Sequence, residues 1–315
     1  MQRRAFIFTY SYENTTISRR VKKKGQNSTL EIVKALNFDY HISIVQLCRY
    51  FSIHRSRYYY WLKSQNSDKT LKENDLKRRI VAIYTNSEYI YGYRRIHIDL
   101  AIELQRKVNH KLVHRLCKVL DIKSIIRVKK RKGYKEARKQ ISENILAQNF
   151  YASAPNQKWV TDITETKVNN DKAYICVIQD LFNREIVSYG VSKHANTELV
   201  YKTMQTLFAK HKEAKDVIIH SDQGVQFTAK RIKKLIKRNG FKASNSRAGN
   251  CLDNAVVENF FSHYKSELIY LNNIQTYKEL VDRTNKYMYF YNNERRQIKT
   301  KMTPVEIREQ YYNNN

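Results

Sequence analysis

The stretch WVTDITETKVNNDKAYICVIQDLFNREIVSYGVS, residues 159–192, decides the fold of the second half of this chain. Its apolar and β-branched residues form three runs, 159–168, 172–180 and 185–192, separated by clusters rich in Asn, Asp and Arg. Polar clusters of this kind favour tight turns between strands. The stretch therefore predicts a meander of three antiparallel strands, with Asp162 inside the first.

The residues that follow extend this meander into a mixed α/β pattern. Helical periodicity over 197–210 is followed by the apolar run 217–219, which suits a buried strand. A second helix is expected over 229–238, then a short strand and a helix that carries Glu258. Three strands, a helix, a strand, a helix, a short strand and a helix follow each other as in an RNase H-like α/β fold. We therefore expect this fold for residues 152–315, with a helical C-terminal tail.

Three acidic residues lie where this fold would bring them together. Asp162 is in the first strand, Asp222 follows a buried strand, and Glu258 is in a helix, with 35 residues between it and Asp222. Phosphodiester chemistry is slow unless two divalent ions, roughly 4 Å apart, activate the attacking oxygen and stabilise the leaving one. The three carboxylates are candidate catalytic residues and metal ligands. Oxygen-only ligands favour two Mg²⁺ ions, for which Mn²⁺ could substitute.

Lys265 is a candidate DNA contact because it follows Glu258 by seven residues, almost two helical turns. The two side chains should share one face of the helix, about 10 Å apart along its axis. Glu258 could then bind metal while Lys265 holds a DNA phosphate. An ordinary surface lysine is the alternative.

The charge of the chain favours a polyanionic partner. The 315 residues contain 59 Lys and Arg against 29 Asp and Glu, and residues 1–150 alone contain 33 against 12. Nucleic acid fits better than a membrane, because no long basic amphipathic helix is visible. Charge alone leaves a basic ribosome-associated protein as an alternative. No apolar stretch approaches the roughly 18 residues of a membrane span, and four dispersed cysteines suggest no zinc site, so we expect a cytoplasmic, nucleoid-associated protein.

The basic first half divides into four segments by its pattern. Residues 1–40 are expected to form a weakly ordered basic arm, and residues 41–66 either a helix-turn-helix-like segment or an ordinary helical hairpin. Residues 67–126 predict a second helical, helix-turn-helix-like domain. Its last helix places leucines on one face, which leaves Lys111 and Arg115 for solvent or DNA phosphate. Residues 127–151 read as a basic linker, either solvated or tracking DNA.

Several motifs, in order and with matching spacing, resemble one known family. They are PNQKWVTDIT (155–164), HSDQGVQF (220–227), GNCLDNAVVENFF (249–261), KSEL (265–268) and YNNERR (291–296). The chain resembles the second-frame (OrfB) transposases of the IS-three family of bacterial insertion sequences, which share the integrase catalytic core with retroviral integrases. The resemblance covers roughly residues 42–312.

This resemblance implies a transposase whose catalytic core is preceded by an all-α, helix-turn-helix-like region. Asp162, Asp222 and Glu258 would bind two Mg²⁺ ions and drive strand cleavage at the element's ends, then joining to a second DNA. Arg94 and Arg95, in a motif that resembles the family's helix-turn-helix-like segment, are further candidates for DNA contact. Expected partners are double-stranded DNA, a first-frame (OrfA) protein and further copies of the chain on DNA. A DNA-binding regulator that does not cut, and a plain RNase H-like nuclease, are the alternatives.

Overall fold

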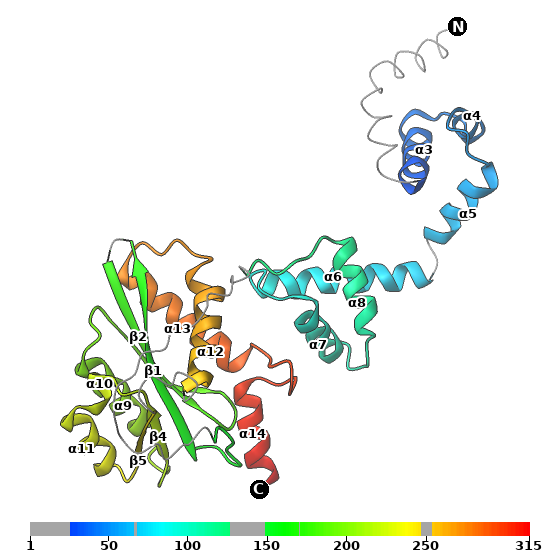
Figure 1. The fold of residues 1–315 in the computed structure, drawn as a ribbon. Helices are drawn as coiled ribbons and strands as arrows, with labels where there is room; N and C mark the ends of the chain where they lie inside the picture. Colours follow the sequence, from blue (N-terminus) through cyan, green and yellow to red (C-terminus); the bar gives the residue numbers. More distant parts are fainter. Residues whose placement is uncertain (1–25, 66–67, 127–148, 170, 247–253) are drawn as a thin grey trace. The chain divides into compact units, whose positions relative to one another are not determined.

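The computed structural model divides into two compact units, one ending at Val81 and the other beginning at Ala82 (Figure 1). Each unit is described by itself. The described residues are 26–65, 68–126, 149–169, 171–246 and 254–315. Most of the expected linker, 127–148, lies outside them. None of the described helices is long and apolar enough to cross a membrane.

The first unit is helical. Its described helices are α3 (Gln26–Tyr40), α4 (Ile44–Tyr50), α5 (Arg55–Gln65) and most of α6 (Asp68–Asn86). The two short helices expected over 41–66 are α4 and α5. Between them the chain turns sharply at Ser52, whose φ is 55°, and the Ile53 amide donates to the Cys48 carbonyl at 2.8 Å.

The expectation of a weakly ordered arm over residues 1–40 is wrong for its last part. Residues 26–40 form α3, which buries Leu30 and Val33 against Cys48, Tyr58 and Trp61 of α4 and α5. The pattern is hard to detect because α3 also carries exposed apolar residues, Phe38 and Tyr40, and because the partners of its buried residues lie more than ten positions further along the chain. Residues 1–25 lie outside the described residues.

The second unit starts with the helices that the sequence predicted over 67–126. After the end of α6 come α7 (Tyr93–Glu103) and α8 (His110–Val119). The side chain of Asn109 caps α8 by accepting from the Lys111 amide at 2.9 Å. The two helices pack through fully buried residues: Ile96, Leu100, Val113 and Leu116.

The described part of the core contains a five-stranded sheet in the order β3-β2-β1-β4-β5. The strands are β1 (Lys158–Val168), β2 (Asp171–Asp180), β3 (Ile186–Ser192), β4 (Ile218–Ser221) and β5 (Lys242–Asn245). The first three form the predicted antiparallel meander. β4 and β5 join beside β1 in parallel, as a strand does when a helix forms the crossover.

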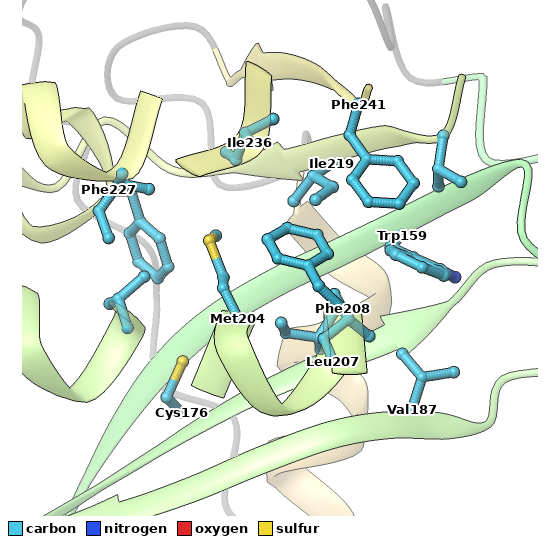
Figure 2. Packing of buried hydrophobic residues seen from close by; sticks show 14 of the residues in the cluster. Trp159, Cys176, Val187, Met204, Leu207, Phe208, Ile219, Phe227, Ile236 and Phe241 are labelled. Carbon is cyan, nitrogen blue, oxygen red and sulfur yellow. The ribbon is translucent and has the colours of Figure 1, made fainter. Parts of the chain in front are cut away.

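Helices cover both faces of the sheet, which explains why consecutive residues of β2 are buried along most of the strand. One face packs on α9 (Thr197–Lys210), α10 (Val225–Thr228) and α11 (Lys230–Arg238). Figure 2 shows this cluster, in which the rings of Trp159, Phe208 and Phe241 pack against one another.

The opposite face packs on α12 (Ala255–Tyr264) and α13 (Tyr277–Asn293). Alternate residues of β1 point to opposite faces, so Val160 belongs to this second cluster while Trp159 belongs to the first. Asp162, two residues after Val160, therefore lies on the α12 side. The last helix, α14 (Pro304–Asn314), begins with a capping box between Thr303 and Glu306.

Candidate active site

Sheet register brings Asp162 and Asp222 to the same level. β1 and β4 run parallel with Val160 opposite His220. Asp162 and Asp222 each follow those partners by two residues, and neighbouring strands lie about 4.8 Å apart. The two carboxylates therefore leave adjacent strands at one end of the pairing, as the sequence predicted.

Asp222 is held by the turn that follows β4. Its carboxylate accepts from the Gly224 amide at 2.9 Å, and its carbonyl accepts from the Asn245 side chain at 3.1 Å. A Cβ at Gly224 would lie 2.9 Å from the Asp222 carboxylate, so a larger residue would displace this carboxylate from its present position. The HSDQG motif thus fixes the position of its acid.

Glu258 approaches from α12, which packs on β1. The side chain of Asn254, at the start of the helix, donates to the Thr161 carbonyl at 3.2 Å and anchors this end of α12 one residue from Asp162. Glu258 is solvent-exposed, in the first turn of the helix. All three predicted acids therefore come from elements that meet where β4 ends.

The carboxylates of Asp222 and Glu258 influence the protonation of Asp162, whose pKa is strongly shifted. The pKa of Asp162 is raised to about 7, mainly by burial and to a lesser extent by the carboxylates of Asp222 and Glu258, while the Ile163 amide and Lys265 oppose the shift. The Ile163 amide donates to the Asp162 carboxylate at 2.8 Å. Glu258 is exposed, yet partial loss of hydration next to the sheet also raises the pKa of its carboxyl group. A cation placed among these carboxylates would reverse the shift and favour their ionised forms.

The donor set suits a hard divalent cation, since it consists of carboxylate oxygens beside a solvent-accessible helix face. Among the described residues, however, no three His, Cys, Asp or Glu side chains lie close enough together to hold a metal ion. The fold brings the elements that carry the three acids together, but the carboxylates do not form a complete metal site. Asp162 is partly buried on the strand, and Glu258 is exposed to solvent.

Lys265 lies at the point where α12 changes its winding. The helix continues from Tyr264 into a π-helical turn over Lys265–Ile269, closed by the Tyr270 amide donating to the Lys265 carbonyl at 2.8 Å. Such wide turns occur mostly at functional positions. The Lys265 charge lowers the pKa values of Asp162 and Glu165, so its ammonium group is close enough to affect the acids.

The other candidates for DNA contact divide into two groups. Arg94 on α7 and Lys111 and Arg115 on α8 are exposed. Arg94 lies beside the Tyr93 ring, with its guanidinium 5.9 Å from the ring centroid. Arg95 points inward instead: its side chain is 14% exposed and lies 3.8 Å from the Glu267 carboxylate.

Glu267 is a charged residue next to the site that the sequence analysis did not single out. It is 3% exposed, and Arg295 grips it with two hydrogen bonds of 2.8 and 2.6 Å. Tyr287 donates a third at 2.9 Å. Burial would raise the pKa of Glu267, but Arg295 and Arg95 reverse this and leave it below its usual value. Glu267 therefore remains charged within the core.

This buried carboxylate joins three parts of the second unit. It sits in the π-helical turn after Lys265, Arg295 follows α13, and Arg95 belongs to α7. Nearby His263 lies 3.7 Å from the carboxylate, but burial and Arg295 lower its pKa to about 4, so it is neutral and forms no ion pair at pH 7. A sequence signal existed: Glu267 falls three residues after Tyr264 and seven after Phe260, on the apolar stripe.

Not every acid in the core belongs to this site. Asp180 is fully buried, yet its carboxylate accepts from the Asn156 and Phe182 amides at 2.8 Å and from the Trp159 indole at 3.2 Å. These bonds close the β2–β3 connection against β1. Asp180 is structural, and it ends β2 opposite Trp159, whereas Asp162 lies opposite Val177.

Comparisons with known proteins match both the core and the helical region before it. Family models for an integrase core domain match residues 152–251 and 258–312, and a model for an HTH-like domain matches residues 71–130. Among solved structures, the HTLV-2 integrase catalytic core domain in complex with magnesium is similar at 18% identity and a TM-score of 0.38, over 50% of this chain and 98% of that one.

Curated relatives share much more sequence. A putative transposase, InsK, for the insertion sequence element IS150 of Escherichia coli is 41% identical over 85% of this chain and 94% of its own length. A transposase-like protein of Haemophilus influenzae is 38% identical over 66% of this chain and 96% of its own length. The transposase InsF for IS3A of Escherichia coli is 30% identical over 72% of this chain and 80% of its own length.

The predicted fold class is confirmed by the family models and by the sheet topology: an integrase core of mixed α/β structure follows a helical, HTH-like region. The predicted family is confirmed by the extent of the identity to the transposases. This chain belongs to the IS-three family of insertion-sequence transposases, with an integrase-like core.

Proposed function

We propose that this protein cleaves and joins DNA strands at the ends of its insertion sequence, with Asp162, Asp222 and Glu258 as the metal-binding catalytic residues. The observation that carries the proposal is the register of β1 and β4, which aligns Asp162 with Asp222 beside the helix that bears Glu258. Family membership supports the reaction class. A structural role for these three acids would not require them to converge at an exposed corner.

Each residue would have a role that follows from its position: the three acids would bind metal, and Lys265 would bind DNA. Two Mg²⁺ ions, or Mn²⁺ in their place, would activate the attacking oxygen and stabilise the leaving one. Asp162 must be deprotonated to bind a metal, and with a pKa of about 7 it loses its proton near neutral pH. Glu258, exposed on α12, would turn inward when DNA and metal arrive. Lys265 would hold a phosphate of the scissile strand.

Membership of the transposase family supports two successive phosphoryl transfers at this site. Water attacks the phosphorus at the element's end, and the P–O bond to the 3′ oxygen breaks, which leaves a 3′-hydroxyl. That hydroxyl then attacks a phosphodiester of a second DNA, forming a new bond and releasing the 3′-hydroxyl of the target strand. The first step consumes one water and the second exchanges one phosphodiester for another, so neither needs an oxidant or a further reactant. A first-frame partner and further copies of this chain would complete the assembly on DNA.

The test is strand cleavage and joining on labelled duplexes that carry the terminal repeat of the element, with Mg²⁺ or Mn²⁺. Asp222→Asn should remove both products, by about a thousandfold or more if several kcal/mol of transition-state stabilisation are lost. Asp216→Asn is the matched control, because Asp216 is exposed and has a φ of 56°, which asparagine tolerates. Cleavage that survives Asp222→Asn would exclude the proposed active site. Binding without products in the unaltered protein would favour the non-cutting regulator.

A further inference from the structure

A cavity of about 360 Å³ lies next to the proposed active site, on the α12 side of the sheet. This volume falls within the roughly 300 to 1,000 Å³ of small-ligand pockets. Its lining contains one charged residue, an arginine, together with amides and aromatic rings. The polar and aromatic residues of the lining include Phe150, Gln179, Arg184, Asn259, Tyr291 and Gln297.

The register of the sheet places this cavity close to Asp162. Gln179 of β2 pairs with Val160 of β1, two residues before Asp162 and on the same face. Two residues along a strand span about 7 Å. On the helix side, Asn259 follows Glu258 directly. A strand of DNA whose phosphate lies at the three acids would therefore run close to the cavity.

Gln179 leaves a buried hydrogen-bond acceptor without a partner. Its side chain is 1% exposed, and its Nε2 donates to the Arg184 carbonyl at 2.8 Å and to the Tyr291 hydroxyl at 3.2 Å. The carbonyl can only accept, which fixes the orientation of the amide. Its Oε1 then has no hydrogen-bond partner in the described part of the chain. Buried polar atoms are rarely left unpaired without a reason.

Arg184, another residue of the lining, has a buried hydrogen-bond donor without a partner in the described part of the chain. Its Nη1 is buried and has no hydrogen-bond partner among the described residues. The residue is held in the left-handed region, with a φ of 67°, so the turn that presents the side chain is strained for a residue other than glycine. Its backbone carbonyl is already used by Gln179. Beside the cavity, the Nη1 donor is therefore unpaired within the described structure, and a small rotation of the side chain would present it to a ligand.

An unpaired acceptor and an unpaired donor on two residues of the lining are best satisfied by a ligand that offers both a donor and an acceptor. A phosphate alone fits poorly, because its oxygens and Gln179 Oε1 are all acceptors. The edge of a nucleobase presents donors and acceptors side by side, and arginine, glutamine and asparagine are the side chains that read such edges. Phe150 and Tyr291 provide aromatic surface, and α12 begins at the cavity without a side-chain cap at Asn254.

We propose that this cavity receives one base of the bound DNA end, unstacked from the duplex next to the cleaved phosphate. Gln179 Oε1 would accept from the base, and Arg184 would donate to it. Such unstacking is unfavourable by itself, and these contacts would offset it. The inference rests on the proposed function, since it assumes that a DNA end occupies the three acids.

The test uses the full chain with Asp222→Asn, which blocks cleavage, and terminal-repeat duplexes that carry 2-aminopurine at each position beside the cleavage site in turn. The fluorescence of 2-aminopurine rises when it leaves the stack, so one position should brighten several-fold on binding. Arg184→Gly should abolish this rise. It removes the side chain but suits the φ of 67°, so the fold is preserved. Lys301→Gly is the matched control, because Lys301 is also basic, has a φ of 61°, and is exposed outside the cavity lining.

A second experiment distinguishes a contact between Arg184 and a base from a contact between Arg184 and a phosphate. Arg184→Gly should weaken binding to the normal end on the order of tenfold. On a duplex with an abasic site at the position that brightened, Arg184→Gly and the parent protein should bind equally. Equal weakening on both duplexes would mean that Arg184 holds a phosphate, and no brightening at any position would mean that the cavity holds water; either result overturns the inference. Cleavage by the unaltered protein, measured in parallel, reports separately on the proposed function.

Discussion

Basic side chains are exposed to solvent on α8 but lie inside the protein in the charged cluster around Glu267. On α8, Lys111 and Arg115 are exposed. Around Glu267, Arg295 is buried and Arg95 is largely buried, and both lie against the Glu267 carboxylate. A count of charges makes these arginines and lysines equivalent. The comparison shows that net charge indicates what class of molecule the protein binds. Packing decides which lysine and arginine side chains are exposed and can contact that molecule.

The neighbours Arg94 and Arg95 show this difference within one helical turn. Both are candidates for DNA contact by sequence, yet Arg94 is exposed and Arg95 lies against Glu267. About one hundred degrees of helical rotation separates consecutive residues. In α7 this rotation turns one arginine to solvent and the next to the core.

The largest effect is expected from removing the carboxylate at the centre of the buried cluster. Glu267→Ala leaves Arg295, which is 5% exposed, without its partner. Breaking a buried pair in this way costs about 3 to 5 kcal/mol of unfolding free energy. Urea denaturation followed by circular dichroism measures the loss. Glu165→Ala, at an exposed pair with Lys172, should change stability by less than about 1 kcal/mol.

A smaller effect, of opposite sign, is expected at the active site. The pKa of Asp162 is about 7 in the folded protein, against an ordinary value of 3.8. Since the folded value is raised, the stability that this group contributes is complete below about pH 4 and is lost as the pH rises through about 7. Asp162→Asn should therefore raise the melting temperature in EDTA at pH 8 by a few degrees, and by much less at pH 4.

Divalent metal provides a second test of the role of Asp162, through its effect on thermal stability. Metal needs the ionised carboxylate, so Mg²⁺ or Mn²⁺ should stabilise the unaltered protein more at pH 8 than at pH 6. Asp162→Asn should abolish this metal-dependent stabilisation. A melting temperature that does not respond to the ion at any pH would argue against Asp162 as a ligand.

The two arginines of α7 offer a direct test of the comparison. Arg95→Met should cost about 1 to 3 kcal/mol of stability, because Arg95 is largely buried beside Glu267. Arg94→Met should leave stability unchanged and weaken DNA binding instead. Melting curves and fluorescence anisotropy on a terminal-repeat duplex measure the two quantities. The reverse pattern would mean that Arg95 turns outward on DNA.

The smallest energetic effect is expected on α8. Replacing Lys111 and Arg115 together with alanine should leave the unfolding free energy unchanged within about 0.5 kcal/mol. DNA affinity should fall, and the slope of log K against log salt should become shallower by roughly 0.9 for each phosphate that the variant no longer neutralises. An unchanged slope would remove this face from the DNA interface.

The sequence predicted the catalytic core in detail because its signals are local. Alternation in 159–192 indicated the meander, and the apolar run 217–219 indicated the buried strand β4. Motif order pointed to the three acids before any register was known. The helix over 197–210 matches α9 at both ends, since its N-cap Asn196 and its apolar stripe are visible in the sequence.

Local signals failed where a residue's role depends on a distant partner. Leu30 and Val33 order α3 through contacts with α4 and α5, which the weak pattern of 1–40 did not reveal. Glu267 lies in a motif whose lysine suggested a DNA contact, but its own partner Arg295 is 28 residues away.

The sequence by itself determined the family, the strand and helix order of the core, and the chemical identity of the three acids, because periodicity and motif spacing are properties of the chain. Tertiary structure alone decided that Arg95 faces Glu267 and that Gln179 lines a cavity beside Asp162. Burial sets the cost of a charge or an unpaired polar atom. Burial in turn depends on residues that meet only after the chain has folded.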